Sequence, residues 1–156
     1  MTNAIFNLPE SHNEPAMSYA PGTRERALLK AELDRQYNQV VDIPLIIGGE
    51  EVRTGRLQKA VCPHEHGHVL AQYHEAGEAE IRQAIDAALQ AKFAWKYTPW
   101  EERAAIFNRM ASLISGRYRY ILNAATMLNQ SKTAHQAEID STCETADFFL
   151  YNAKFM

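Results

Sequence analysis

The sequence predicts an α+β fold in which two β-hairpins are covered by a helical layer, with four to five helices in all. Two patterns carry this prediction. Short apolar runs separated by turn residues fill 44–75, and apolar residues recur at helical spacing from 78 onward. A length of 156 residues with 46% apolar content suits a single packed domain. Two small hairpins are not stable alone, so the helices must cover them.

Charge and composition argue against several kinds of partner. The net charge is -3 and charged residues make up 22% of the chain, so nucleic acid is not an expected partner. No apolar run approaches the roughly 18 to 20 residues that span a bilayer, and the first residues lack a signal-peptide pattern, so no membrane association is expected. Cys62 and Cys143 show no C-x-x-C spacing, which favours a reduced, cytoplasmic chain with two ordinary buried thiols.

Residues 1–22 are predicted to form an extended N-terminal arm that either stays loose or lies across a partner surface. Pro9, Pro15 and Pro21 lie in this stretch and disfavour a helix. Thr23 is the expected N-cap of a surface helix that ends before Pro44. The apolar stripe expected on this helix consists of Ala27 and Ala31, joined less regularly by Leu28 and Tyr37.

Two hairpins are expected next. The first covers 44–53, where Gly48 and Gly49 separate two short apolar runs and accept the positive φ of a tight turn. The second pairs 57–62 with 68–75 around a turn at 63–67. Gly48-Gly49 is not a phosphate-binding loop, because neither glycine-rich nucleotide motif is present and no helix follows it.

Three helices are expected between 78 and 128. The first covers 78–93. Thr98, Pro99 and Glu101 have the pattern of an N-cap, a first helical position and a capping box, so a second helix should begin there and end near Gly116. The third covers 117–128. The residues expected to face inward are Ile81, Ala84, Ile85, Ala88 and Leu89 in the first helix, Ile106, Met110 and Leu113 in the second, and Ile121, Leu122, Ala125 and Leu128 in the third.

Three histidines around the second turn form a candidate metal site. His64, His66 and His68 alternate, so on a strand they would share one face, and His74 or Cys62 would supply a fourth ligand. The competing interpretation is a polar turn with solvated imidazoles. A metal-binding protein of this kind would hold stoichiometric zinc and lose it when His66 is replaced.

The last stretch, 130–156, is expected to contain a helix of about 20 residues with a polar line of Glu138, Thr142 and Thr145 beside an apolar one. Composition alone favours a solvated carboxylate at Glu138. Cys143 has no histidine at helical distance and is expected to be an inert buried thiol.

The order of elements from Leu45 onward resembles the N-terminal part of the Rossmann-type cofactor domain of the aldehyde dehydrogenase superfamily. The hairpins I-I-G-G-E-E-V and P-H-E-H-G-H-V and the helices that follow carry this likeness. Within the superfamily the chain is most similar to the 1-pyrroline-5-carboxylate dehydrogenases. The segments that distinguish them are N-E-P-A-M-S-Y-A-P-G-T-R-E-R at 13–26, the turn at 65–68, and Q-A-E-I-D-S-T-C-E-T-A-D-F-F-L-Y-N-A-K-F at 136–155.

The resemblance implies an NAD-dependent oxidation of L-glutamate γ-semialdehyde to L-glutamate in proline degradation, by an enzyme that is usually a homo-oligomer. It implies that 23–156 is an incomplete N-terminal portion of the cofactor-binding domain, truncated after Met156. The family's catalytic Cys, oxyanion Asn, general-base Glu and glycine-containing cofactor turn have no counterpart here. No catalytic, cofactor-binding or metal-binding residue is therefore assigned, and Cys62 and Cys143 do not inherit the nucleophile's role.

One site residue is assigned through the resemblance. The Glu of Q-A-E-I-D reaches the substrate pocket in these dehydrogenases and aligns with Glu138, so Glu138 is a predicted substrate-binding residue, for recognition or support of the pocket. A carboxylate there suits a substrate with an α-ammonium group. The isolated chain is expected to be inactive. The alternative hypothesis is a non-catalytic helical module that binds a partner through its exposed apolar stripes.

Overall fold

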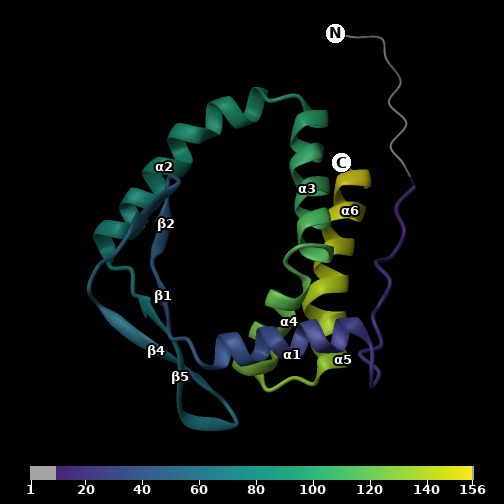
Figure 1. The fold of residues 1–156 in the computed structure, drawn as a ribbon. Helices are drawn as coiled ribbons and strands as arrows, with labels where there is room; N and C mark the ends of the chain where they lie inside the picture. Colours follow the sequence, from purple (N-terminus) through teal and green to yellow (C-terminus); the bar gives the residue numbers. More distant parts are fainter. Residues whose placement is uncertain (1–9, 156) are drawn as a thin grey trace.

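A computed structural model of the chain describes residues 10–155. In Figure 1 the small sheets lie on the left, α1 crosses the bottom of the molecule next to α4, and α3 and α6 run side by side on the right. The elements in chain order are α1 Arg24–Tyr37, β1 Val41–Ile43, β2 Leu45–Ile47, β3 Glu50–Val52, β4 Leu57–Cys62, β5 Glu65–His74, α2 Glu78–Tyr97, α3 Trp100–Ser115, α4 Arg119–Gln130, α5 Ala134–Ala137, the π-helix η1 Glu138–Cys143 and α6 Glu144–Phe155.

Both predicted hairpins are present. Strands β2 and β3 pair around Gly48 and Gly49, and β4 pairs antiparallel with β5. The second turn is shorter than expected, because β5 already begins at Glu65. Strand β1 was not predicted. It pairs parallel with β5, with Val41 opposite Ala71, and completes a three-stranded sheet in the order β1-β5-β4.

Helix α1 begins where the sequence predicts but buries a different face. The Thr23 hydroxyl accepts a hydrogen bond from the Arg26 amide, as an N-cap does. The expected stripe of Ala27 and Ala31 with Leu28 and Tyr37 is wrong, because these residues face solvent. The buried residue is Leu29, which packs with Tyr19 and Ala124. Tyr19 belongs to the arm and Ala124 to α4, so the arm and α4 together cover this face of α1.

The predicted N-cap at Thr98 is also wrong. Helix α2 continues past 93 to Tyr97, and the Thr98 hydroxyl donates to the Ala94 carbonyl at 2.9 Å. Thr98 therefore closes α2 instead of opening α3. The residue before α3 is Pro99, which makes no side-chain cap. The Thr98 hydroxyl cannot cap the start of α3 while it bonds the end of α2. Because α2 extends to Tyr97, Thr98 lies at the end of α2.

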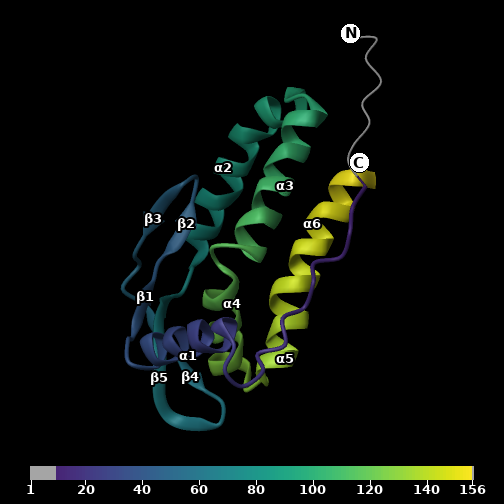
Figure 2. The same ribbon diagram turned by 45° about the vertical axis from the view of Figure 1, so that its right-hand side comes forward.

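The apolar faces expected to point inward on α2 and α3 are largely open. No residue of α2 is buried, and Ile81, Ile85 and Leu89 are 53%, 53% and 59% exposed. On α3 the expected Ile106 and Met110 are exposed. The face of α3 that packs carries Ala104, Ala111 and Ile114, because α6 is the helix beside it (Figure 2).

Burial is divided among three small clusters. Tyr19, Leu29 and Ala124 form one, Cys62, Leu70 and Leu128 form the second, and Ala111, Ile114 and Ala146 form the third. Helix α4 contributes to the first two directly and to the third through the half-buried Leu122. It also contacts α1, α3, α5 and η1, so it is the central element of the fold.

The helix of about 20 residues expected within 130–156 is present, because α5, η1 and α6 follow one another without interruption from Ala134 to Phe155. Its π-helical part was not predicted, and a break separates the helix from α4. Ser131 ends α4 in the left-handed conformation, Thr133 caps α5, and the π-helix η1 lies between α5 and α6. Arm residues beyond Glu10 run alongside α6 in both views (Figure 2). No helix among residues 10–155 is both long and apolar enough to cross a bilayer.

Candidate functional site

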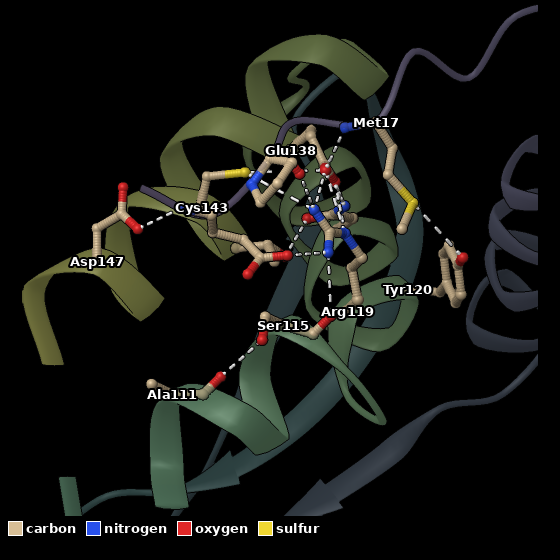
Figure 3. A network of polar contacts seen from close by, with 12 residues as sticks. Met17, Ala111, Ser115, Arg119, Tyr120, Glu138, Cys143 and Asp147 are labelled. Carbon is tan, nitrogen blue, oxygen red and sulfur yellow. Dashed lines mark hydrogen bonds and ion pairs between the residues drawn. The ribbon is translucent and has the colours of Figure 1, made fainter. Parts of the chain in front are cut away.

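Glu138 lies at the centre of a buried polar cluster. Its side chain is fully buried, at 0% exposure, so the solvated carboxylate favoured by composition is wrong. Figure 3 shows the carboxylate surrounded by donors from the arm and α4. Oε1 accepts from the Met17 amide at 2.8 Å and from Arg119 Nη2 at 2.5 Å. Oε2 accepts from the Tyr19 hydroxyl at 2.6 Å and from Asn123 Nδ2 at 2.7 Å.

Arg119 is the cation of the cluster and is itself 2% exposed. Its Nε donates to Glu138 at 3.1 Å. Nη1 donates to Glu14 Oε1 at 2.7 Å and to the Ser115 carbonyl at 3.0 Å. Nη2 donates to the Pro15 carbonyl at 2.7 Å as well as to Glu138. All five N–H donors of the guanidinium therefore have acceptors, two of them in the arm.

Helices α4 and η1 bring the remaining members together. Arg119 and Asn123 are four residues apart on α4, so both reach the same face. Asn123 is fully buried, and its Oδ1 accepts from Thr142 Oγ1 at 2.8 Å. Thr142, which the helical spacing placed beside Glu138, therefore belongs to the cluster. Thr145 does not, since it lines a groove between α3, α4 and α6.

The face that α4 buries agrees only in part with the expected one, since Leu128 is buried and Leu122 is half-buried as expected. Ile121 and Ala125 were expected to point inward but are exposed, whereas Arg119 and Asn123 are buried. A polar pair at helical spacing in an otherwise apolar helix is the sequence signal that would have identified this face. The arm residues that complete the cluster give no such local signal.

Hydrogen bonding decides the charge on Glu138. Burial alone would raise its pKa, but the donors Arg119, Tyr19, the Met17 amide and Asn123 together hold the pKa below its ordinary value. The carboxylate is therefore ionised at neutral pH. Burial and the neighbouring carboxylate of Glu138 raise the pKa of Tyr19, so its hydroxyl stays protonated and continues to donate.

Cys143 borders the cluster as a buried thiol. Its Sγ lies 3.8 Å from Glu138 Oε1 and 3.8 Å from Arg119 Nη2. Burial, and then the charge of Glu138, raise the pKa of the Cys143 thiol to about 11. A thiol in that state is a poor nucleophile, because the reactive species is the thiolate. This agrees with the expectation that Cys143 is an inert buried thiol.

A groove of about 490 Å³ lies between α3, α4 and the η1–α6 segment. Its wall is mostly apolar, and a Lys132–Asp140 ion pair of 2.6 Å lies among its lining residues. Residues that line it include Met110, Ile114, Leu122, Thr126, Thr145 and Phe149. Glu138 and its partners are not among the lining residues, so the groove and the polar cluster are separate features.

The three histidines of the second hairpin do not converge. His64 Nδ1 lies 2.8 Å from Ser131 Oγ, and its ring contacts Cys62 Sγ. His68 stacks on Tyr37 with ring centroids 3.8 Å apart, while His66 faces solvent. Within residues 10–155, no three or more His, Cys, Asp or Glu side chains are grouped so as to hold a metal. The structure therefore does not support the three-histidine metal hypothesis.

The described residues also do not assemble a dinucleotide site. Gly48 and Gly49 connect two strands, so no helix N-terminus follows them. Gly77 does lead from β5 into α2, but its amide already donates to the Glu80 carboxylate at 2.7 Å. Glu78 and Glu80 place negative charge where a pyrophosphate would bind. The described part of the chain therefore does not fit NAD by itself.

Comparison with known proteins identifies the family. The Aldehyde dehydrogenase family pattern matches residues 51–156, more than half of the chain. The chain belongs to the aldehyde dehydrogenase family. It is 47% identical over 154 residues to the delta-1-pyrroline-5-carboxylate dehydrogenase of Agaricus bisporus, covering 98% of this chain and 28% of that protein. It is 39% identical over 97% of its length to a mitochondrial enzyme of the same name from Dictyostelium discoideum, of which it covers 27%.

Solved structures of this family have the same fold over the whole described chain. The delta-pyrroline-5-carboxylate dehydrogenase from Mycobacterium tuberculosis, solved bound with NAD, is 41% identical with a TM-score of 0.95, over 99% of this chain and 29% of that one. The α+β fold and its likeness to a part of the aldehyde dehydrogenase fold are thereby confirmed. The chain spans between a quarter and a third of the length of these relatives.

Proposed function

We propose that this chain forms the N-terminal segment of an NAD-dependent dehydrogenase that oxidises L-glutamate γ-semialdehyde to L-glutamate. The observation that supports this most is the identity of 47% over 98% of the chain to a delta-1-pyrroline-5-carboxylate dehydrogenase. The likeness includes the arm, where Tyr19 and the Met17 amide contact Glu138. The chain alone has no catalytic residue assigned to it, so by itself it is inactive in this proposal.

Glu138 is the proposed substrate-pocket residue, and the geometry favours a supporting role. Its two oxygens already accept hydrogen bonds from Met17, Tyr19, Asn123 and Arg119. A carboxylate has about four lone-pair sites, so little capacity remains for a direct bond to a substrate. Its influence would then be electrostatic, through a fixed negative charge that favours a substrate with an α-ammonium group.

A hybrid enzyme tests the proposal. Residues 1–156 would replace the matching segment of the Mycobacterium tuberculosis dehydrogenase, which the TM-score of 0.95 makes feasible. We expect the hybrid to form NADH with glutamate γ-semialdehyde, and the chain alone to form none. A soluble hybrid that oxidises a simple aldehyde but not the semialdehyde would contradict the substrate assignment. Turnover by the isolated chain would contradict the need for the rest of the enzyme.

Replacement of the carboxylate tests the role of Glu138 in that hybrid. Glu138→Gln replaces a charged carboxylate, which accepts several hydrogen bonds, by a neutral amide. A hydrogen bond to a charged group contributes roughly 1.5–3 kcal/mol. We therefore expect kcat/KM for the semialdehyde to fall about 10- to 100-fold. Glu144→Gln is the matched control, because Glu144 is exposed and lies on the same helical stretch. Equal loss in both variants would refute a specific role for Glu138.

The cellular location and assembly also belong to this proposal. We place the protein in the cytoplasm on the cysteine pattern of the sequence, although several relatives carry the word mitochondrial in their names. We propose a homo-oligomer for the intact enzyme, by likeness to the family. Fractionation of cells that express a tagged protein tests the first point, and light scattering of the purified hybrid tests the second.

A further inference from the structure

The N-terminal arm supplies two of the four residues whose N–H or O–H groups donate to the Glu138 carboxylate. The Met17 amide and the Tyr19 hydroxyl come from residues 121 and 119 positions earlier in the chain. The other donors, Arg119 and Asn123, come from α4. Without the arm, Glu138 would lose one donor at each oxygen. A buried carboxylate that loses donors becomes costly to keep ionised.

The arm also controls Arg119. Glu14 and the Pro15 carbonyl accept from Nη1 and Nη2, so two of the five guanidinium donors depend on the arm. These contacts fix the plane of the guanidinium, whose other edge faces Glu138 (Figure 3). A planar guanidinium with all donors used has one orientation, so the arm determines where Arg119 presents its charge.

The charges of this group do not cancel. Glu14 and Glu138 are two carboxylates on one guanidinium, and Tyr19 remains neutral because its hydroxyl keeps its proton. The cluster therefore carries one excess negative charge. Glu138 and Arg119 are almost completely buried, whereas the Glu14 side chain is 23% exposed, so water partly screens its charge. The neighbouring Cys143 thiol is also neutral and adds no charge.

From these contacts we propose that Glu14 and Tyr19 of the arm, acting through Arg119 and directly on Glu138, are positioning residues for recognition of the ammonium group of an amino-aldehyde substrate. This inference rests on the proposed function. The arm then contributes to substrate specificity as well as to the stability of the fold. In this proposal none of these residues contacts the reacting aldehyde.

The chain offers a matched control for each positioning residue. Tyr151 is also a tyrosine whose hydroxyl bonds the arm, at 3.2 Å from the Ser11 carbonyl and 3.0 Å from Asn13 Oδ1. Asp147 binds the amide of Glu14 and is therefore no control. Tyr151→Phe loosens the arm at a distance from the cluster, and Glu144→Gln changes an exposed carboxylate outside it.

The first measurement is kinetic, in the hybrid enzyme. We expect Tyr19→Phe and Glu14→Gln to raise KM for glutamate γ-semialdehyde about 5- to 10-fold, with less than about a 2-fold change in kcat. For a short aldehyde without charge, kcat/KM should change less than about 2-fold. Tyr151→Phe and Glu144→Gln should leave kcat/KM for both substrates nearly unchanged. Equal losses on charged and uncharged aldehydes would mean a merely structural role and would overturn the proposal.

The second measurement does not depend on activity. The side-chain carboxyl of Glu138 is followed by NMR through a pH titration of the 156-residue chain. We expect Tyr19→Phe to raise its midpoint by about one pH unit, whereas Tyr151→Phe leaves it unchanged. An unshifted midpoint in Tyr19→Phe, or an ordinary glutamate titration in the parent chain, overturns the positioning role. A hybrid without semialdehyde turnover overturns the proposed function instead, so the two failures are distinguishable.

Discussion

At the scale of single residues, the Glu138–Arg119 pair is the most consequential contact. Both side chains are almost completely buried, at 0% and 3% exposure. Removing one partner of a buried ion pair leaves an uncompensated charge, which costs roughly 3–5 kcal/mol. We expect Arg119→Ala to lower the free energy of unfolding by that amount in urea denaturation. The replacement leaves the carboxylates of Glu138 and Glu14 close together without their cation.

Arg82→Ala is the control for that experiment. Arg82 pairs with Glu78 on α2, but the two side chains are 73% and 79% exposed. Solvent screens such a pair, and many exposed ion pairs contribute nothing measurable to stability. We expect no resolvable change in unfolding. Similar losses in Arg119→Ala and Arg82→Ala would mean that the buried cluster does not stabilise the fold.

The pH dependence of stability should report on Glu138. Its pKa is held below the ordinary 4.5, so the folded state binds the proton less readily than the unfolded state. The stabilisation is therefore complete above about pH 5 and is lost as the pH falls through the lowered value. We expect Glu138→Gln to unfold with a weaker dependence on pH between about pH 5 and 2. Glu144→Gln should keep the parent dependence in the same thermal melts.

Only part of this site was accessible from the sequence. Glu138 was nominated through the family resemblance, and Thr142 through helical spacing. Arg119 and Asn123 were missed because the apolar residues beside them, Ile121 and Ala125, dominated the assignment of the buried face. Tyr19 could not have been found by spacing, because its contact with Glu138 closes a loop of 119 residues.

At the scale of helices and strands, the sequence predicted best those elements that depend on interactions between residues close together in the chain. The hairpin around Gly48 and Gly49 formed as expected, since its turn chemistry lies within a few residues. Strand β1 was missed because Val41–Ile43 is too short for a periodic signal and pairs with β5 about thirty residues later. Thr98 was misassigned because the same residue suits the end of one helix and the start of the next.

The turn between β2 and β3 gives a prediction for this level. Gly49 has φ +91° with no atom within 4 Å of an added Cβ, so an alanine there meets strain but no clash. Left-handed backbone costs a non-glycine residue roughly 1–2 kcal/mol. We expect Gly49→Ala to lower the free energy of unfolding by about 1 kcal/mol. Gly67→Ala, in equally open space without positive φ, should change it little or slightly increase it.

At the scale of the whole molecule, the buried residues form separate clusters and the apolar face of α2 is exposed to solvent. The three clusters are small, while α2 buries none of its apolar residues. The relatives are more than three times as long as this chain. In the proposed intact enzyme the additional polypeptide would cover these faces. The spacing of apolar residues placed a stripe on α2 but could not show that this chain leaves the stripe exposed.

The open face of α2 should make the isolated chain associate. Ile85 and Leu89 are more than half exposed and lie four residues apart, so they form a continuous apolar strip with Ile81. Contiguous apolar surface of this kind promotes association between copies. We expect the apparent mass in light scattering to rise with concentration, and the double replacement Ile85→Glu and Leu89→Glu to suppress the rise. Because α2 buries none of its residues, helical circular dichroism should persist in that variant. A parent chain that stays monomeric and unfolds in one sharp thermal transition would instead favour a self-sufficient helical module.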